Sequence, residues 1–165
     1  MDNLTIDRSK IFIPDGQPIT VALKRTTDLV FAAHQDDVEI MCGGPIIECL
    51  HDSSRYLGAI IFTDGRGSPR SGKYQHYSAE DMIKVRSEEQ KKAAIIGEYS
   101  FLIELGYSSA DIKSSNTTAI VDNIKNIIQV VCPHKIYTHN LADKHETHVA
   151  VCLRVIEALR QMAPL

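Results

Sequence analysis

The stretch Phe31-Ala-Ala-His-Gln-Asp-Asp-Val-Glu-Ile40 decides the expected fold of this chain. It continues an apolar run that begins at Leu29, and unbroken apolar runs are typical of strands buried on both faces of a parallel sheet. Four groups that can bind metal ions or move protons follow the run: His34, Asp36, Asp37 and Glu39. Open α/β sheets bind their ligands at the carboxyl ends of the strands. The stretch therefore predicts an α/β protein with a candidate site at one edge of its sheet.

This polar cluster has two interpretations. In a regular strand His34 and Asp36 would point to one face and Asp37 to the other, so the three can converge only if the chain turns directly after Ala33. Imidazole nitrogen and carboxylate oxygen are ligands that suit zinc. Asp also caps helices, because it satisfies the free N–H groups at their positive ends. We expect Glu39 to cap the following helix, and the stretch by itself leaves both interpretations open.

The rest of the chain alternates between strand and helix patterns. Strands are predicted at 28–33, 57–63, 99–105 and 135–138, and helices at 41–53, 78–97, 120–131 and 149–162. Residues 1–20 contain several turn signals and are predicted to form an irregular lead-in, and residues 64–77 form a polar, glycine-containing loop. This alternation predicts a mostly parallel sheet with helices on its faces.

Length and charge limit the class of protein. The 165 residues are predicted to form a single domain, 1–165, and a net charge of -3 indicates no general affinity for nucleic acid or for an anionic membrane. No signal peptide and no membrane span are predicted. The four cysteines lie in apolar patterns without a Cys-x-x-Cys pair, so buried, reduced thiols in a cytoplasmic protein are expected. The sequence leaves a homo-oligomer open.

A second cluster follows the last predicted strand, in Thr138-His-Asn-Leu-Ala-Asp-Lys-His-Glu-Thr-His148. It also opens a helix, so it should reach the same carboxyl edge of the sheet as the first cluster. His145 and His148 are three residues apart and share one side of a helical turn. A helix N-terminus disfavours the imidazolium form and keeps histidine able to coordinate a metal. A solvated helix start would explain this cluster alone, but two such clusters at one edge favour a site.

Four other motifs are excluded by the sequence. His145-Glu-Thr-His148 is one residue short of the His-Glu-x-x-His zinc motif. Gly67-Ser-Pro-Arg-Ser-Gly-Lys73 resembles a phosphate-binding loop, but Tyr74 stands where Ser or Thr should bind magnesium. No glycine-rich dinucleotide signature follows the first predicted strand, and no nucleophile elbow is present.

Four segments together resemble the LmbE/PIG-L family of zinc-dependent N-acetylglucosaminyl de-N-acetylases. They are Ala33-His-Gln-Asp-Asp-Val-Glu39, Thr63-Asp-Gly65, Arg86-x-x-Glu89 running to Ala93 and Gly97, and Asp143-x-His-x-x-His148. The resemblance runs from about Ile11 to the end of the chain, in the family's order. It implies a Rossmann-like three-layer fold. The implied activity is removal of an N-acetyl group from an N-acetylglucosamine-type small molecule or glycoconjugate.

The resemblance also implies roles for individual residues. His34, Asp37 and His148 would bind Zn²⁺, and Arg86 would contact substrate hydroxyls. Asp36 would be the general base, and His145 would stabilise the tetrahedral intermediate or protonate the leaving amine. These roles agree with general chemistry, because three protein ligands leave a fourth zinc position open and a neighbouring carboxylate can accept a proton.

The sequence departs from the family pattern in three respects. Gln35 stands where the family most often has Pro, and Thr147 stands where many members have an Asp that tunes the catalytic histidine. Members also usually continue past the last helix with further strands that help to form the substrate pocket, and we expect this chain to lack them.

Two hypotheses remain from the sequence. One is the de-N-acetylase, and the alternative is a catalytically inactive metal-binding domain with a carbohydrate- or partner-binding role. Asp36 and His145 distinguish them, because metal binding alone would need neither. Arg66, Arg70 and Lys73 give the 64–77 loop a positive face, which favours an anionic group on the substrate or is merely a solvated loop.

Overall fold

A five-stranded sheet forms the centre of the protein in the computed structural model, which describes residues 4–7 and 10–162. The strands are β1 (Ile11–Phe12), β2 (Asp28–Ala32), β3 (Leu57–Thr63), β4 (Phe101–Tyr107) and β5 (Lys135–Thr138). They lie in the order β1-β4-β3-β2-β5, with β1 antiparallel to β4 and every other described pair parallel. The prediction of a mostly parallel α/β sheet is confirmed.

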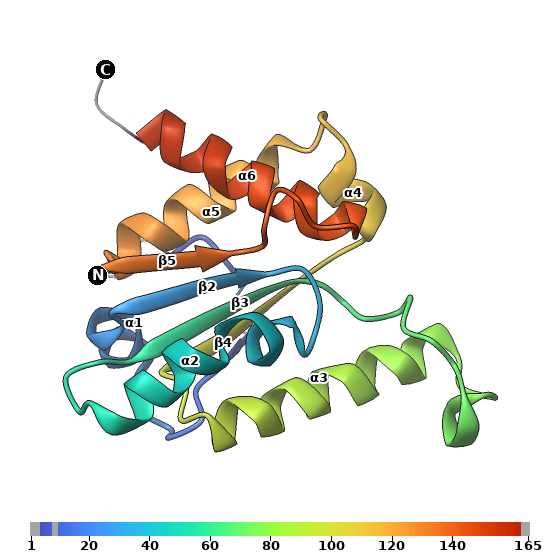
Figure 1. Ribbon diagram of the computed structural model, residues 1–165, viewed down its shortest axis with the longest axis horizontal. Helices are drawn as coiled ribbons and strands as arrows, with labels where there is room; N and C mark the ends of the chain where they lie inside the picture. Colours follow the sequence, from blue (N-terminus) through green and yellow to red (C-terminus); the bar gives the residue numbers. More distant parts are fainter. Residues whose placement is uncertain (1–3, 8–9, 163–165) are drawn as a thin grey trace.

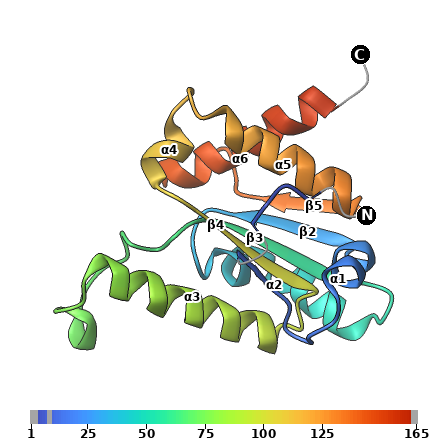
Figure 2. The same cartoon turned by 180° about the vertical axis from the view of Figure 1, so that it is seen from behind.

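Helices cover both faces of the sheet. They are α1 (Ile19–Arg25), α2 (Asp37–His51), α3 (Ala79–Ile96), α4 (Ser109–Lys113), α5 (Thr118–Val131) and α6 (Glu146–Met162), with a short 3-10 turn, η2, at Gly72–Tyr74. Figure 1 shows α5 and α6 on one side of the sheet and α2 and α3 on the other, and Figure 2 shows the same layers from behind. Leu29 and Phe31 pack into the α5–α6 side while Val30 and Ala32 pack into the α2–α3 side, so β2 is apolar on both faces after Asp28.

The strand order places the two polar clusters side by side. From β2 the chain moves through β3 to β4, and it then returns to pair β5 with the other edge of β2, with Phe31 opposite Thr138. The order therefore reverses between β2 and β5. The residues that follow these two strands emerge together at the carboxyl edge, where sheets of this kind bind ligands.

One prediction about the N-terminal residues was wrong, and one short helix was not predicted. Residues 1–20 are not wholly irregular, because Ile11 and Phe12 pair with β4 and α1 begins at Ile19. A two-residue strand carries too little pattern to be recognised in a sequence. Helix α4 was not predicted, although Ser108 and Asp111 form the same reciprocal cap as Ser78 and Asp81 at the start of α3.

Helix α2 begins at Asp37, earlier than the predicted start at 41, and it is kinked. Cys42 has φ -118° and ψ 22°, which is not helical. The cause is Pro45 inside the helix, because a proline has no N–H to donate and its ring clashes with the carbonyl four residues earlier. The residues before the kink thus form a short helical segment of their own at the start of α2.

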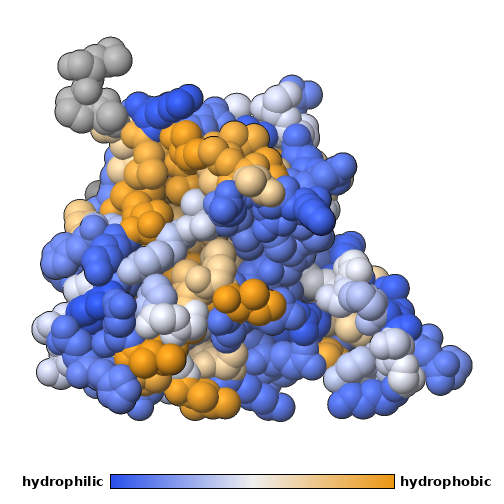
Figure 3. All heavy atoms as spheres, in the orientation of Figure 1, coloured by the Kyte–Doolittle hydropathy of each residue, from blue (hydrophilic) through white to orange (hydrophobic). Residues whose placement is uncertain are grey.

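The surface carries scattered apolar side chains. Figure 3 shows an apolar region over α6 and smaller ones over α2, where Leu153, Leu159 and Ile47 are exposed. None of the helices among the described residues is long and apolar enough to cross a membrane. All four cysteines are free thiols; Cys42 and Cys152 are buried, whereas Cys132 is exposed, contrary to the prediction for that residue.

Candidate metal-binding active site

The end of β2 turns sharply and brings His34 and Asp37 together. Asp36 adopts a left-handed backbone conformation with φ 79°, and α2 begins at the next residue. The backbone N–H of His34 donates to Asp37 Oδ2 at 2.7 Å, and His34 Nδ1 lies 3.2 Å from the same oxygen. Burial alone would raise the pKa of Asp37, but the hydrogen bonds from His34 and the nearby His148 and His139 lower it, so this carboxylate is ionised.

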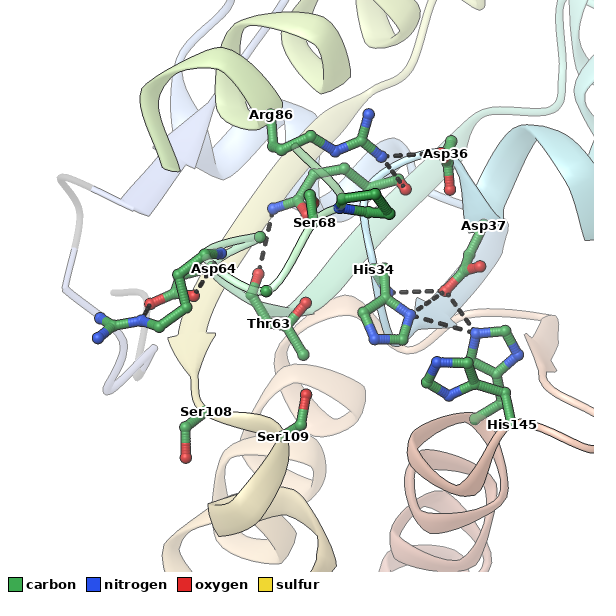
Figure 4. A pocket seen from close by; sticks show the side chains of 16 residues that line it. His34, Asp36, Asp37, Thr63, Asp64, Ser68, Arg86, Ser108, Ser109 and His145 are labelled. Atoms are coloured by element: carbon green, nitrogen blue, oxygen red, sulfur yellow. Dashed lines mark hydrogen bonds and ion pairs between the residues drawn. The ribbon is translucent and has the colours of Figure 1, made fainter. Parts of the chain in front are cut away.

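The start of α6 adds His148 to this pair. His148 Nε2 lies 3.2 Å from His34 Nδ1 and 3.3 Å from Asp37 Oδ2. The three atoms form a nearly equilateral triangle, and Figure 4 shows two of its members, His34 and Asp37, side by side in the pocket and joined by dashed lines. A tetrahedral zinc ion with ligands at about 2.0–2.1 Å spaces them about 3.3 Å apart, so these side chains have the spacing that such an ion requires.

His139, which the sequence analysis did not select, stands beside this triangle. Its Nε2 lies 3.5 Å from Asp37 Oδ2, so Asp37, His139 and His148 form a second group with the spacing of metal ligands. However, the same Nε2 accepts the backbone N–H of Ala33 at 2.8 Å, so its lone pair is already in use. Burial lowers the pKa of His139 to about 4, which keeps the ring neutral. We therefore place His139 next to the site and outside the candidate ligand set.

Asp143 orients His148. Its Oδ2 lies 3.0 Å from His148 Nδ1, and its Oδ1 accepts the backbone N–H of His145 at 2.8 Å. The backbone hydrogen bond and the His148 ring lower the pKa of Asp143 to about 2, so the carboxylate is charged. Carboxylates that hold the second nitrogen of a metal-binding histidine fix its tautomer and direction. No role was predicted for Asp143, although a carboxylate five residues before the candidate ligand His148 could have indicated a partner for its ring.

His145 lies against both His34 and His148. Its ring centroid is 4.8 Å from that of His34 and 4.4 Å from that of His148, and the three also have ligand spacing. Its Nδ1 accepts the backbone N–H of Thr147 at 3.3 Å, so in the neutral ring the proton is on Nε2. Desolvation, and then His148 and His34, lower the pKa of His145 and favour this neutral form.

Asp36 points away from the triangle and towards α3. Its Oδ2 accepts a hydrogen bond from Arg86 Nη2 at 2.8 Å, and the same nitrogen donates to the carbonyl of Gln35 at 2.7 Å. The other side of the guanidinium, Nη1, donates to Glu89 at 2.6 Å. Figure 4 shows Arg86 above Asp36, at the opposite side of the pocket from the histidines. Arg86, which was expected to contact substrate hydroxyls, therefore already binds Asp36, the expected general base.

The loop after β3 forms the remaining wall. The pocket has a volume of about 600 Å³. It is lined by residues of this loop, by Ser108 and Ser109, and by His34, Gln35, Asp36, Asp37, Arg86, His145 and His148. Gly65 has φ 78°, and a side-chain carbon there would lie 2.8 Å from both Gln35 Oε1 and Arg86 Cβ. Only glycine fits this close approach, which explains the Thr-Asp-Gly segment at the end of the strand.

The positive face predicted for the loop is partly neutralised. Arg66 Nε donates to Asp64 at 2.7 Å, and Arg70 donates to the backbone carbonyl of Arg66 at 3.3 Å. Lys73 Nζ lies 4.8 Å from the centroid of the Tyr74 ring. Of these three cations Arg66 lines the pocket, and its side chain is 57% exposed.

The prediction that Glu39 caps α2 was wrong. Glu39 Oε1 instead accepts hydrogen bonds from the Tyr99 hydroxyl at 2.6 Å and from Gln90 Nε2 at 2.9 Å. Gln90 Oε1 in turn accepts the backbone N–H of Asp36 at 2.8 Å. Side chains from α3 and from the segment just before β4 thus reach the turn and the start of α2, a connection that no local pattern in the sequence could indicate.

Comparisons with known proteins agree with this geometry. The family described as PIG-L, GlcNAc-PI de-N-acetylase, matches residues 29–159, a range that includes both strand ends of the site. The protein named "Uncharacterized deacetylase YaiS" from Escherichia coli (strain K12) is 27% identical over 144 residues, which cover 83% of this chain and 70% of YaiS.

Two solved structures share the fold at low identity. The N,N'-diacetylchitobiose deacetylase of Pyrococcus horikoshii has a TM-score of 0.71 and 19% identity, over 82% of this chain and 49% of its own. GalB, the 4-carboxy-2-hydroxymuconate hydratase of Pseudomonas putida KT2440, has a TM-score of 0.68 and 20% identity, over 81% of this chain and 55% of its own. This chain spans about half the length of each, and the fold alone is compatible with more than one reaction.

Proposed function

Because this chain belongs to the PIG-L family of GlcNAc-PI de-N-acetylases, we propose that it is a zinc-dependent hydrolase that removes the N-acetyl group from an N-acetylglucosamine-type small molecule or glycoconjugate. The observation that carries the proposal is the triangle formed by His34 Nδ1, Asp37 Oδ2 and His148 Nε2, with edges of 3.2 to 3.3 Å. Asp36 and His145, the two groups that acid–base chemistry would need, line the same pocket.

His34, Asp37 and His148 would hold the metal ion. Two imidazoles and one carboxylate leave a fourth position open, as catalytic zinc sites do. A bound zinc ion would lower the pKa of a coordinated water towards about 7 and polarise the amide carbonyl of the substrate. Asp143 and the His34 backbone N–H would hold two of these ligands in direction, because they contact His148 Nδ1 and Asp37 Oδ2.

Asp36 would accept the proton of the attacking water. Its Oδ2 is held by Arg86, and no hydrogen bond to Oδ1 is found among the described residues, so Oδ1 is available to take the proton. The side chain is 59% exposed and lines the pocket. The hydrogen bond from Arg86 holds the carboxylate in place at the edge of the pocket, where a general base would be needed.

His145 would act on the other side of the amide. Because Nδ1 accepts the Thr147 N–H, the neutral ring presents Nε2–H as its donor. A donor placed where negative charge develops stabilises the tetrahedral intermediate without any reorganisation. Of the two roles expected from the resemblance, the hydrogen-bond geometry favours stabilisation of the oxyanion over protonation of the amine.

The pocket would accept a small N-acetylated sugar conjugate. Its volume of about 600 Å³ lies within the range of small-molecule sites, about 300–1,000 Å³. Arg86 and Ser108 line it with donors suited to sugar hydroxyls, and Arg66 offers a cation at its mouth. The name of the structural neighbour from Pyrococcus horikoshii, a diacetylchitobiose deacetylase, supports this substrate class.

The test combines metal analysis with an assay of acetate release. The purified chain should bind about one zinc ion per chain, and it should release acetate from N-acetylglucosamine, from N,N'-diacetylchitobiose or from a phosphate-bearing N-acetylglucosamine conjugate. His148→Ala should lose both the metal and the activity. One zinc ion per chain without acetate from any of these substrates would refute the activity and favour the inactive metal-binding domain.

A further inference from the structure

The backbone of Asp36 is held in an unfavourable conformation. Its φ of 79° is in the left-handed region, which a residue with a side chain adopts only at a cost in free energy. The turn between β2 and α2 passes through this residue. Side chains that stabilise the turn therefore determine where the Asp36 carboxylate lies.

Helix α3 contacts both the main chain and the side chain of Asp36. Gln90 Oε1 accepts its backbone N–H at 2.8 Å, and Arg86 Nη2 donates to its carboxylate at 2.8 Å. Arg86 and Gln90 are four residues apart, so they lie on the same face of α3. Arg86 and Gln90 lie 50 and 54 residues after Asp36 in the chain, and both hold it from the same helix.

Contacts of Glu39 with Gln90 and Tyr99 fix the direction of the Gln90 amide. Glu39 Oε1 receives hydrogen bonds from Gln90 Nε2 and from the Tyr99 hydroxyl, at 2.9 Å and 2.6 Å. A carboxylate acceptor requires the NH₂ end of the amide, so the carbonyl end must face the Asp36 N–H. Gln90 and Tyr99 are each only 1% exposed, so water does not compete for these bonds.

We propose that Gln90 is a positioning residue for Asp36. It holds the left-handed turn by accepting the Asp36 N–H, while Glu39 and Tyr99 set its orientation. The inference rests on the proposed function in one respect, since it takes Asp36 as the general base. The network contains no metal ligand, so its loss should displace the base and leave the metal in place.

Gln90→Met tests the proposal through catalysis. Methionine has a similar length and no strong hydrogen-bonding group, so the cavity stays filled while both bonds are lost. We expect kcat to fall about 10- to 100-fold, the usual consequence of a displaced catalytic group, with KM and zinc content unchanged. Tyr99→Phe removes only the outer bond and should have a smaller effect. Ser100→Ala, which removes a buried hydrogen bond to Ala22 on the opposite side of the sheet, is the matched control.

A double-mutant cycle separates positioning from a general structural effect. In an Asp36→Asn background Gln90→Met should change the remaining kcat by less than about threefold, because its target has already been removed. The same fold-loss in both backgrounds would overturn the proposal, and so would loss of zinc from Gln90→Met.

Hydrogen exchange tests the proposal without any activity. The Asp36 amide should be protected in the wild-type protein and should exchange at least about tenfold faster in Gln90→Met by NMR, since its acceptor is gone. The Ala33 amide, which donates to His139, should stay protected in both. If the wild-type protein releases no acetate, the proposed function fails but this measurement still decides whether Gln90 holds the turn. Equal exchange of the Asp36 amide in both proteins would overturn the inference.

Discussion

Asp36 and Asp37 are adjacent and chemically identical, yet the structure gives them different surroundings. Asp37 Oδ2 lies 3.2 Å and 3.3 Å from the two histidine nitrogens and is only 8% exposed as a residue, whereas the Asp36 side chain is 59% exposed and bound to Arg86. Replacing each with Asn is the most informative pair of variants. Asn can still accept the His34 backbone N–H at position 37, and it tolerates the left-handed conformation at position 36.

The expected effects differ in kind. Asp36→Asn should keep its zinc and lose about 10²- to 10⁴-fold in kcat, the usual contribution of a general base, which corresponds to about 2.7 to 5.4 kcal/mol at 1.36 kcal/mol per tenfold. Asp37→Asn should lose zinc, because it removes the charged ligand from a three-ligand site, and should lose activity as a consequence.

The assay measures zinc per chain after gel filtration, together with the initial rate of acetate release at saturating zinc. Excess zinc should not restore Asp36→Asn, since its metal site is intact, but should partly restore Asp37→Asn. If Asp36→Asn loses its metal while Asp37→Asn keeps it, the two roles are reversed. If Asp36→Asn hydrolyses at nearly the wild-type rate, Asp36 is not the base.

Three further predictions follow from other contacts. Asp143→Ala should weaken zinc binding about 10- to 100-fold in a competition with a chelating dye, because the ring of His148 loses its orienting carboxylate; unchanged affinity would show that helix packing alone orients it. Replacing Arg66 and Arg70 with Gln should raise KM for an anionic sugar conjugate and flatten its salt dependence, and unchanged kinetics at low ionic strength would limit the loop to a structural role. Asp28→Asn should weaken the acid dependence of stability measured by urea unfolding. Although burial raises the pKa of Asp28, hydrogen bonds from Arg55, Thr27 and Tyr137 lower it below 3.8 overall. The stabilisation of the fold by ionised Asp28 is therefore present above about pH 4 and is lost as the pH falls through the lowered pKa. If the free energy of unfolding of Asp28→Asn falls with acid as steeply as that of the wild type, this reasoning is contradicted.

The sequence was sufficient for the architecture because local patterns determine it. Both faces of β2 are buried, so the run from Leu29 to Ala33 is apolar throughout, and the alternation with helices favours parallel pairing of β2, β3, β4 and β5. The two polar clusters could be placed at one edge for the same reason. That they touch depends on the pairing of β5 with β2, which no local pattern specifies.

The residues that the sequence analysis missed act through long-range contacts. His139 has a buried partner only because β5 is in register with β2, which brings its ring to the Ala33 N–H. Gln90 lies on a helix rich in charged residues, where a glutamine is typically solvated, and its burial follows from the packing of α3 against the turn. Glu39 was misassigned for a related reason, because its partners Gln90 and Tyr99 lie beyond any helical spacing from it.

The choice between an enzyme and an inactive metal-binding domain depends on the turn at Asp36. The fold does not decide it, since a hydratase and a deacetylase both share this architecture. A domain that only bound a metal would need the triangle of His34, Asp37 and His148, and a glycine at position 36 would form the same left-handed turn at no steric cost. The chain instead has an aspartate there, supported by Gln90 on its backbone and by Arg86 on its carboxylate. Unfavourable backbone conformations persist where the surroundings enforce them, and they gather at sites of chemistry. A carboxylate held at this cost beside the metal site, and outside its ligand set, favours catalysis.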